Sequence, residues 1–149
     1  MIIIADKQDI TRVGLTYLAE QIDKGLEYCC TEDKAALIEA LTKNPNATVF
    51  LDYTLIDIND ANELQIIAQR FRQSLWILFS DELSYDFINQ TVAVNRQFGI
   101  VMKDSPLHEI RESMVYAVRH QRYICQRIAE MLLNPPTNDE QSAALGNLT

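Results

Sequence analysis

The chain has 149 residues, 48% of them hydrophobic, which is enough for one core of ordinary size and too few for two typical domains. A formal net charge of −8 excludes a surface that holds a nucleic-acid backbone by itself, since that needs clustered Lys and Arg. The apolar start is broken after Ala5 by Asp6 and Lys7, too early for a signal peptide or a membrane span. Three cysteines without zinc-site spacing fit reduced thiols, so we expect a cytoplasmic protein that does not contact a membrane.

Five short apolar runs, rich in β-branched and aromatic residues, predict strands. They cover residues 1–5, 26–30, 47–51, 75–79 and 99–102. Apolarity in these runs is mostly continuous rather than alternating, which is typical of parallel strands with helices on both faces.

Segments with helical periodicity separate the runs. Their apolar faces are predicted to contain Ile10, Val13, Tyr17 and Leu18 in the first segment, Ala36, Leu37, Ala40 and Leu41 in the second, and Leu64, Ile67, Ala68 and Phe71 in the third. A fourth, less regular helix is predicted over residues 83–95. The alternation predicts an open, doubly wound α/β sheet with its chemistry at the carboxyl ends of the strands.

The last predicted helix begins after Pro106, with Ser105 as its cap, and its apolar pattern continues to Leu132. Polar composition from Pro135 onward predicts a linker over residues 135–149, so the folded unit is expected to cover residues 1–134. The apolar positions from Tyr123 to Leu133 lie beyond the part needed to cover the sheet. They therefore predict a homodimer formed through this helix.

Polar residues follow four of the predicted strands. Asp6 and Lys7 follow the first, Asp52 the third, Ser80 the fourth and Lys103 the fifth. An aspartate at a strand end is, taken alone, more often a cap of a turn or helix. Because the carboxyl ends of parallel strands lie at one edge of the sheet, this set is expected to converge on one pocket.

The sequence around these positions resembles the receiver domain of bacterial two-component response regulators, from Met1 to about Asn134. The resemblance is carried by residues 3–6 (IIAD), 49–52 (VFLD), 77–80 (ILFS) and 101–104 (VMKD). It implies the CheY-like, flavodoxin-like fold, with five parallel strands in the order 2-1-3-4-5. It also implies a signal-transduction domain that accepts a phosphoryl group from a sensor histidine kinase and is not a multiple-turnover enzyme.

By this resemblance Asp52 is the phosphoacceptor, Ser80 supplies the hydroxyl that contacts the phosphoryl group, and Lys103 is the lysine of the pocket. Asp6, Asp52 and the backbone carbonyl of Thr54 would hold Mg²⁺; a carbonyl ligand does not depend on the side chain. A metal ion and an ammonium group together can neutralise the charge on the transferring oxygens.

Two of the departures from the family pattern, Lys7 and Ile100, bear directly on the pocket and the switch. Lys7 replaces the second acid after the first strand, so Mg²⁺ binding is expected to be weakened or absent. The Lys7 ammonium is predicted to lie within ion-pair reach of Asp52 or Asp6, and Asp57 or Asp60 could supply a substitute acid. Ile100 stands where the family has its switch aromatic, which leaves Ser80 without the ring that usually moves with it.

The end of the chain has its own resemblance. Residues 122–133 and the polar stretch after them are similar to the region between a receiver and a LuxR-type helix-turn-helix output domain, although an ordinary amphipathic tail is an alternative. DNA binding would then belong to an output domain that follows this chain. A homodimer would hold two such domains at a fixed spacing.

The same residues bear on three other functions. A pseudo-receiver, which keeps the fold as a protein-interaction or dimerisation module without phosphorylation, is favoured by Lys7 and Ile100. An enzyme of the haloacid-dehalogenase type would need a second acid where Thr54 stands. Flavin binding is disfavoured because the loop from Asp6 to Asp9 lacks glycine and small hydroxyl residues.

Overall fold

The computed structural model describes residues 1–54, 56–58 and 60–135. Its five parallel strands form one sheet in the order β2-β1-β3-β4-β5. The strands are β1 Ile2–Ala5, β2 Tyr28–Thr31, β3 Thr48–Leu51, β4 Leu75–Ser80 and β5 Phe98–Met102. Each strand lies at a predicted apolar run, and the expected fold class and strand order are confirmed. Most of the predicted linker, residues 136–149, lies outside the described residues.

The register of the strands aligns the residues that follow them. Ala5 lies opposite Leu51, and Leu51 lies opposite Leu78. The Asp52 N–H continues this pattern by donating to the Ala5 carbonyl at 3.1 Å, and the Lys103 N–H donates to the Ser80 carbonyl at 3.2 Å. The polar residues after β1, β3, β4 and β5 therefore leave the sheet at one edge.

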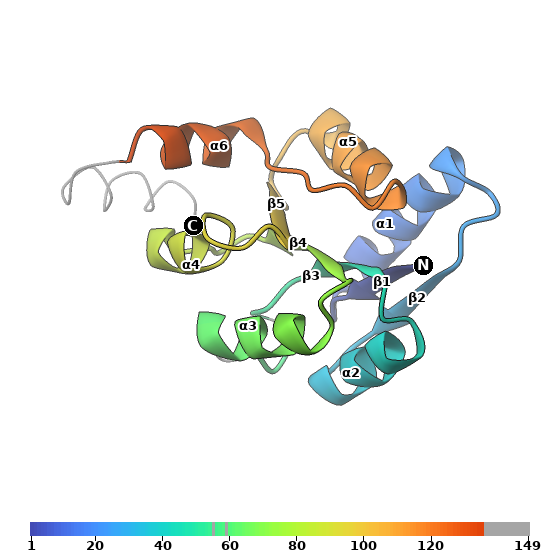
Figure 1. Cartoon of the computed structure of the whole chain (residues 1–149). Helices are drawn as coiled ribbons and strands as arrows, with labels where there is room; N and C mark the ends of the chain where they lie inside the picture. Colours follow the sequence, from blue (N-terminus) through green and yellow to red (C-terminus); the bar gives the residue numbers. More distant parts are fainter. Residues whose placement is uncertain (55, 59, 136–149) are drawn as a thin grey trace.

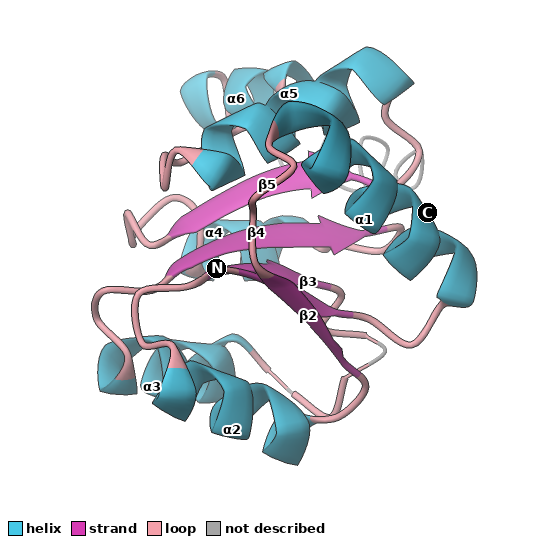
Figure 2. Cartoon of the chain, turned by 90° about the vertical axis from the view of Figure 1, so that its right-hand side faces the viewer, coloured by secondary structure: helices cyan, strands magenta, loops and turns pink. Residues whose placement is uncertain are grey.

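Helices cover both faces of the sheet (Figures 1 and 2). On one face lie α1 Asp9–Ile22 and α5 Leu107–Val118; on the other lie α2 Lys34–Lys43, α3 Ala61–Arg70 and α4 Tyr85–Gln90. Asp33, Asp60 and Ser84 cap α2, α3 and α4 by accepting a backbone N–H three residues further on. Asp60 is thus a helix cap and not an acid of the pocket, and Asp57 is exposed.

The burial of α1 differs from the sequence prediction. Only Leu18 of its four predicted core positions is buried, whereas Ile10, Val13 and Tyr17 are 80%, 65% and 59% exposed. The helix carries a second apolar stripe at helical spacing, and this stripe faces the core through Leu15, Leu18 and Ala19. Part of the predicted core face of α1 is therefore an exposed apolar surface.

The last helix is not continuous, contrary to the prediction. α5 ends at Val118, His120 has a positive φ of 55°, and a second helix, α6 Gln126–Leu133, follows an extended stretch. Ser105 is not the cap of α5: Pro106 precedes the first turn, and no side chain caps it. α6 lies beyond β5, past the end of the sheet (Figure 1). Over the described part of the chain, every helix is too short or too polar to cross a membrane.

Candidate functional site

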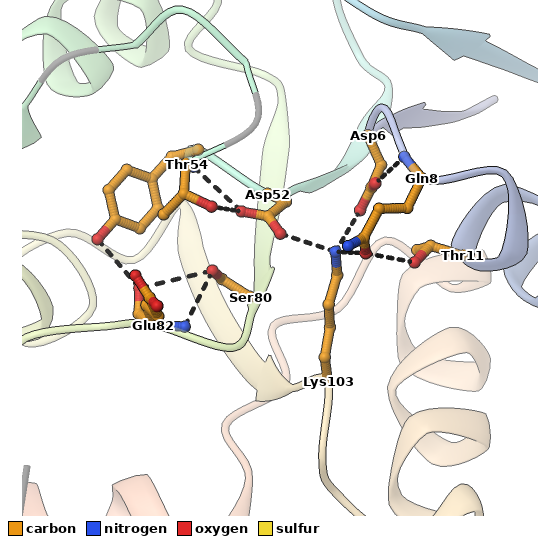
Figure 3. A network of polar contacts seen from close by, with 9 residues as sticks. Asp6, Gln8, Thr11, Asp52, Thr54, Ser80, Glu82 and Lys103 are labelled. Atoms are coloured by element: carbon orange, nitrogen blue, oxygen red, sulfur yellow. Dashed lines mark hydrogen bonds and ion pairs between the residues drawn. The ribbon is translucent and has the colours of Figure 1, made fainter. Parts of the chain in front are cut away.

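An ammonium group shared by two carboxylates lies at the carboxyl edge of the sheet (Figure 3). Lys103 Nζ is 2.7 Å from Asp52 Oδ2 and 2.9 Å from Asp6 Oδ2. The three side chains are 8%, 4% and 2% exposed, respectively. The predicted convergence of Asp6, Asp52 and Lys103, which come from three different strand ends, is present in the structure.

A fourth residue completes the surroundings of the ammonium. Gln8 Oε1 accepts a hydrogen bond from Lys103 Nζ at 2.6 Å and another from Thr11 Oγ1 at 3.2 Å. The Gln8 N–H donates to Asp6 Oδ1 at 2.7 Å, so Asp6 also caps the turn that leads into α1. Asp6 thus has both the structural and the pocket role. No motif or spacing in the sequence had marked Gln8 as a residue of the pocket.

The charges of the pocket keep Lys103 protonated. Burial by itself lowers the pKa of Lys103, but the contacts to Asp52 and Asp6 outweigh it, and the net pKa is raised above the usual value. Asp6 Oδ2 meets the ammonium as an ion pair by distance, yet it makes no well-directed hydrogen bond within the described chain. We regard that contact as electrostatic, because Lys103 points its hydrogen bonds at Asp52 and Gln8.

Thr54 donates hydrogen bonds to the second carboxylate oxygen of Asp52. Its N–H donates to Asp52 Oδ1 at 3.1 Å and its hydroxyl donates to the same atom at 2.6 Å. Thr54 was expected only to offer a backbone carbonyl to a metal, and the contact of its side chain was not predicted. Both carboxylate oxygens of Asp52 are therefore hydrogen-bonded, one to Lys103 and one to Thr54.

Lys7 does not enter the pocket. Its side chain is exposed and makes no ion pair with Asp6 or Asp52, so that prediction is wrong. Neighbouring residues in an extended stretch direct their side chains to opposite sides, and Asp6 and Gln8 are the two that face the ammonium. Lys103, which follows β5 at the same edge of the sheet, provides the cation that was expected from Lys7.

The residues do not fit a tightly held Mg²⁺ in this arrangement. Within the described residues no three His, Cys, Asp or Glu side chains group as metal ligands. The two carboxylates that are available, from Asp6 and Asp52, already share the Lys103 ammonium. A metal ion that needs near-octahedral oxygen ligands would have to displace this ammonium from at least one of them.

The predicted switch residues, Ser80 and Ile100, are not brought together. Ser80 is buried at the end of β4 opposite Met102, and its Oγ accepts from the Glu82 N–H at 3.3 Å. Ile100 is fully buried opposite Leu78. Figure 3 shows Ser80 beside Asp52, with its hydroxyl turned to the backbone of Glu82.

An aromatic residue that sequence reasoning missed lies next to the pocket. Tyr53 follows Asp52 directly, and its hydroxyl donates to the Glu82 carbonyl at 3.1 Å. Its ring stacks on Phe87 of α4, with centroids 4.1 Å apart and planes 10° from parallel. Tyr53 thus connects the loop after β3 with α4.

A groove of about 620 Å³ runs from the pocket between α1 and α5. Lys103 and Asp81 lie at its pocket end, and its walls include Ile10, Tyr17 and Leu107, all largely exposed. Exposed apolar surface of this kind commonly marks a protein contact.

The sheet order and the two helical layers are those of a flavodoxin-like receiver fold. Two solved structures share it: a response regulator from Thermotoga maritima, with a TM-score of 0.61 at 16% identity, and a signal receiver domain assigned to the response regulator NarL from Mycobacterium tuberculosis, with a TM-score of 0.58 at 20% identity. The first match covers 76% of this chain and 95% of that one; the second covers 79% and 91%. The sequence matches no protein-family model and no curated protein.

Proposed function

We propose that this chain is a signal receiver domain that accepts a phosphoryl group on Asp52 from a sensor histidine kinase. The observation that carries the proposal is the Lys103 ammonium held between Asp52 and Asp6 at the carboxyl edge of a receiver-type sheet. In the transfer, a carboxylate oxygen of Asp52 forms a bond to phosphorus while the bond from phosphorus to the donor breaks, and the donor keeps that electron pair. Lys103 would stabilise the charge on the transferring oxygens.

The apolar groove supports a protein as the phosphoryl donor. It begins beside Lys103 and extends over α1 and α5, so a partner seated on Ile10, Tyr17 and Leu107 would lie next to the acid pocket. Such placement brings the donor and the acceptor together before transfer. We propose that this partner is the kinase. Because Asp52 would accept one phosphoryl group per chain, we expect no multiple-turnover enzyme activity.

The test is phosphorylation by a small donor. The full chain is incubated with acetyl phosphate, with and without Mg²⁺, and its intact mass is measured. We expect one added phosphoryl group, with only a modest effect of Mg²⁺ because metal binding is proposed to be weak. Asp52→Asn should abolish the adduct and Asp57→Asn, at an exposed acid, should not. An adduct that persists in Asp52→Asn would contradict the proposal.

A second candidate is a pseudo-receiver that works without phosphorylation as a protein-interaction or dimerisation module. The observation that favours it is the saturation of Asp52, since Lys103 and Thr54 already bind both carboxylate oxygens. The pocket thereby resembles a neutralised state. Absence of any adduct with acetyl phosphate or with a cognate kinase would favour this alternative.

The output of the domain is proposed to lie in other parts of the regulator. We propose that the regulator acts on transcription through a separate DNA-binding output domain, because a chain with a net charge of −8 is not expected to bind DNA by itself. We also propose a homodimer, now through the end of α6, where Leu133 is 80% exposed beside the half-buried Met131 and Leu132. The free cysteines support a cytoplasmic location.

A further inference from the structure

The chain closes the open edge of its own sheet. Residues 121–133, named here the strap, run in an extended stretch along β5 and then form α6. The Ile100 N–H donates to the Tyr123 carbonyl at 2.7 Å, and the Cys125 N–H donates to the Ile100 carbonyl at 2.9 Å. These bonds satisfy backbone groups that an edge strand would otherwise leave unpaired.

Buried side chains hold the strap in place. Tyr123, Cys125 and Ile128 are 8%, 1% and 0% exposed, and the Tyr123 ring meets Tyr116 of α5 edge to face at 5.2 Å. The apolar stripe of the strap is therefore used within the chain. It would become exposed if the strap left the edge of β5.

Gly99 makes the close approach of the strap possible. A Cβ atom at this position would lie 2.3 Å from the Tyr123 carbonyl oxygen and 3.0 Å from its nitrogen, both backbone atoms that no side-chain rotation can move away. The seated strap and a side chain at position 99 are thus mutually exclusive. By contrast, a Cβ at Gly14 on α1 would meet nothing within 4 Å.

Arg122 fastens the strap to α4 as well as to β5. Its Nε donates to the Phe98 carbonyl at 2.8 Å, and a terminal guanidinium nitrogen donates to the carbonyl of Val92, just after the end of α4. Hydrogen bonds from a charged donor are stronger than neutral ones. A shift of α4 would break the second of these bonds.

The other end of α4 is fastened to the acid pocket. Phe87, in its first turn, stacks on Tyr53, the residue after Asp52. The Tyr53 hydroxyl and the Ser80 hydroxyl both bond to the backbone of Glu82, in the loop before α4. Tyr53, the neighbour of Asp52, and Arg122 of the strap therefore make their contacts at opposite ends of the same short helix.

We propose that the strap is a releasable cover of the β5 edge, controlled by the position of α4 and, through the Tyr53–Phe87 stack, by the state of Asp52. Phosphorylation of Asp52 displaces Lys103 or Thr54 from the carboxylate oxygens of Asp52. The loop that carries Tyr53 then moves and draws α4 away from Arg122. The strap then leaves β5 and exposes Tyr123, Cys125 and Ile128. The coupling of the strap to α4 is argued from contacts alone, whereas its coupling to Asp52 rests on the proposed function.

The cover is tested first by hydrogen exchange of the full chain, read by mass spectrometry. Gly99→Ala and Arg122→Gln should each speed exchange in residues 121–133 by about tenfold or more, while β1 and β3 stay protected. Gly14→Ala is the matched control and should leave the strap unchanged. If Gly99→Ala disturbs the whole sheet, Arg122→Gln decides, and wild-type protection of the strap in Arg122→Gln would overturn the proposal.

Coupling through α4 is tested without phosphorylation by a matched pair of substitutions. Phe87 and Phe71 are both buried, at 7% and 8% exposure, but Phe71 lies at the end of α3. Phe87→Leu should speed exchange in the strap because it weakens the stack with Tyr53, and Phe71→Leu should not. Equal effects of the two substitutions would overturn the coupling.

The link to Asp52 is tested on samples whose intact mass reports phosphorylation. A phosphorylated wild-type chain should exchange faster in the strap, and phosphorylated Tyr53→Leu should show a smaller increase. An adduct that leaves strap exchange unchanged overturns this link. If no adduct forms, the proposed function fails, and the Phe87 and Phe71 pair still decides whether α4 controls the strap.

Discussion

At the scale of single residues, the pocket is organised around one cation. Lys103 contacts two buried carboxylates and one amide oxygen, so its removal would leave two buried carboxylates without the cation that balances their charge. Breaking a buried ion pair by removing one member costs far more than losing a pair at the surface. Lys103 is therefore expected to stabilise the fold as well as to serve the chemistry.

Lys103→Met should lower the free energy of unfolding at neutral pH by about 3–5 kcal/mol, the range for an uncompensated buried charge. Urea denaturation measures this change. Lys43→Met removes a cation whose pair with Glu39 is more than two-thirds exposed, and it should cost no more than about 0.5 kcal/mol. Similar losses in the two variants would mean that the Lys103 ammonium is not required to balance the pocket.

Thr54→Val should test which oxygen of Asp52 attacks. The substitution removes the hydroxyl bond to Oδ1 and keeps the Lys103 bond to Oδ2. If Oδ1 is the nucleophile, phosphorylation by acetyl phosphate should become faster, at a cost of roughly 0.5–1.5 kcal/mol in stability. Thr42→Val, a similar change on the exposed face of α2, is the control. An unchanged or slower rate points to attack by Oδ2.

The residues of the site were predictable where they follow a strand directly. Asp6, Asp52 and Lys103 meet because parallel strands in register bring their carboxyl ends to one edge. Gln8 and the Thr54 side chain were missed, and Lys7 was misplaced. The direction of a side chain in a loop depends on the loop backbone, which neither spacing nor hydrophobic pattern specifies.

At the scale of elements, all five strands were predictable because their runs are apolar on both faces. The break between α5 and α6 was not, since Tyr123, Ile124 and Ile128 continue the apolar pattern of the helix before them. In the structure Tyr123 and Cys125 alternate with the half-buried Ile124, which is the period of an extended segment. Over so few residues the two periods are hard to tell apart, and neither glycine nor proline marks the turn at His120.

The strap should detach at high pH. Burial, with smaller contributions from Glu112 and Glu109, raises the pKa of Tyr123 from 10.0 to about 12. A raised pKa in the folded state means that Tyr123 stabilises the fold fully below pH 10 and loses this contribution as pH rises toward about 12. Ultraviolet titration of the wild type against Tyr123→Phe measures the ionisation. A Tyr123 that ionises near its ordinary value would contradict the buried position of the strap.

At the scale of the whole molecule, two of the apolar surfaces exposed in the described part of the chain bear on its partners. One is the groove wall with Ile10, Tyr17 and Leu107, and the other is the end of α6 with Leu133. The fold class and layer order followed from the sequence and its resemblance. The packing of the last apolar stripe against β5 was not predictable from the sequence. It depends on the open edge of β5, which exists only in the assembled sheet.

Leu133→Asp should shift the proposed dimer toward monomer, because it places a charge in the apolar end of α6. Leu107→Asp, at a residue that is 69% exposed on the other surface, should leave the dimer intact. Light scattering over a concentration series measures both. A wild type that is monomeric throughout, or a dimer lost only with Leu107→Asp, would contradict assembly through α6.

The edge pairing of the strap also sets an order of events during folding. Residues 121–125 pair with β5 through a single bridge, whereas β4 and β5 pair along five residues, so we expect the contact of the strap to form after the rate-limiting step. A substitution that weakens it, such as Arg122→Gln, should then accelerate unfolding and leave the refolding rate nearly unchanged, with a φ-value near zero. Stopped-flow measurements over a range of denaturant would show this. The strap would thus be the last part of the domain to fold and the first to unfold.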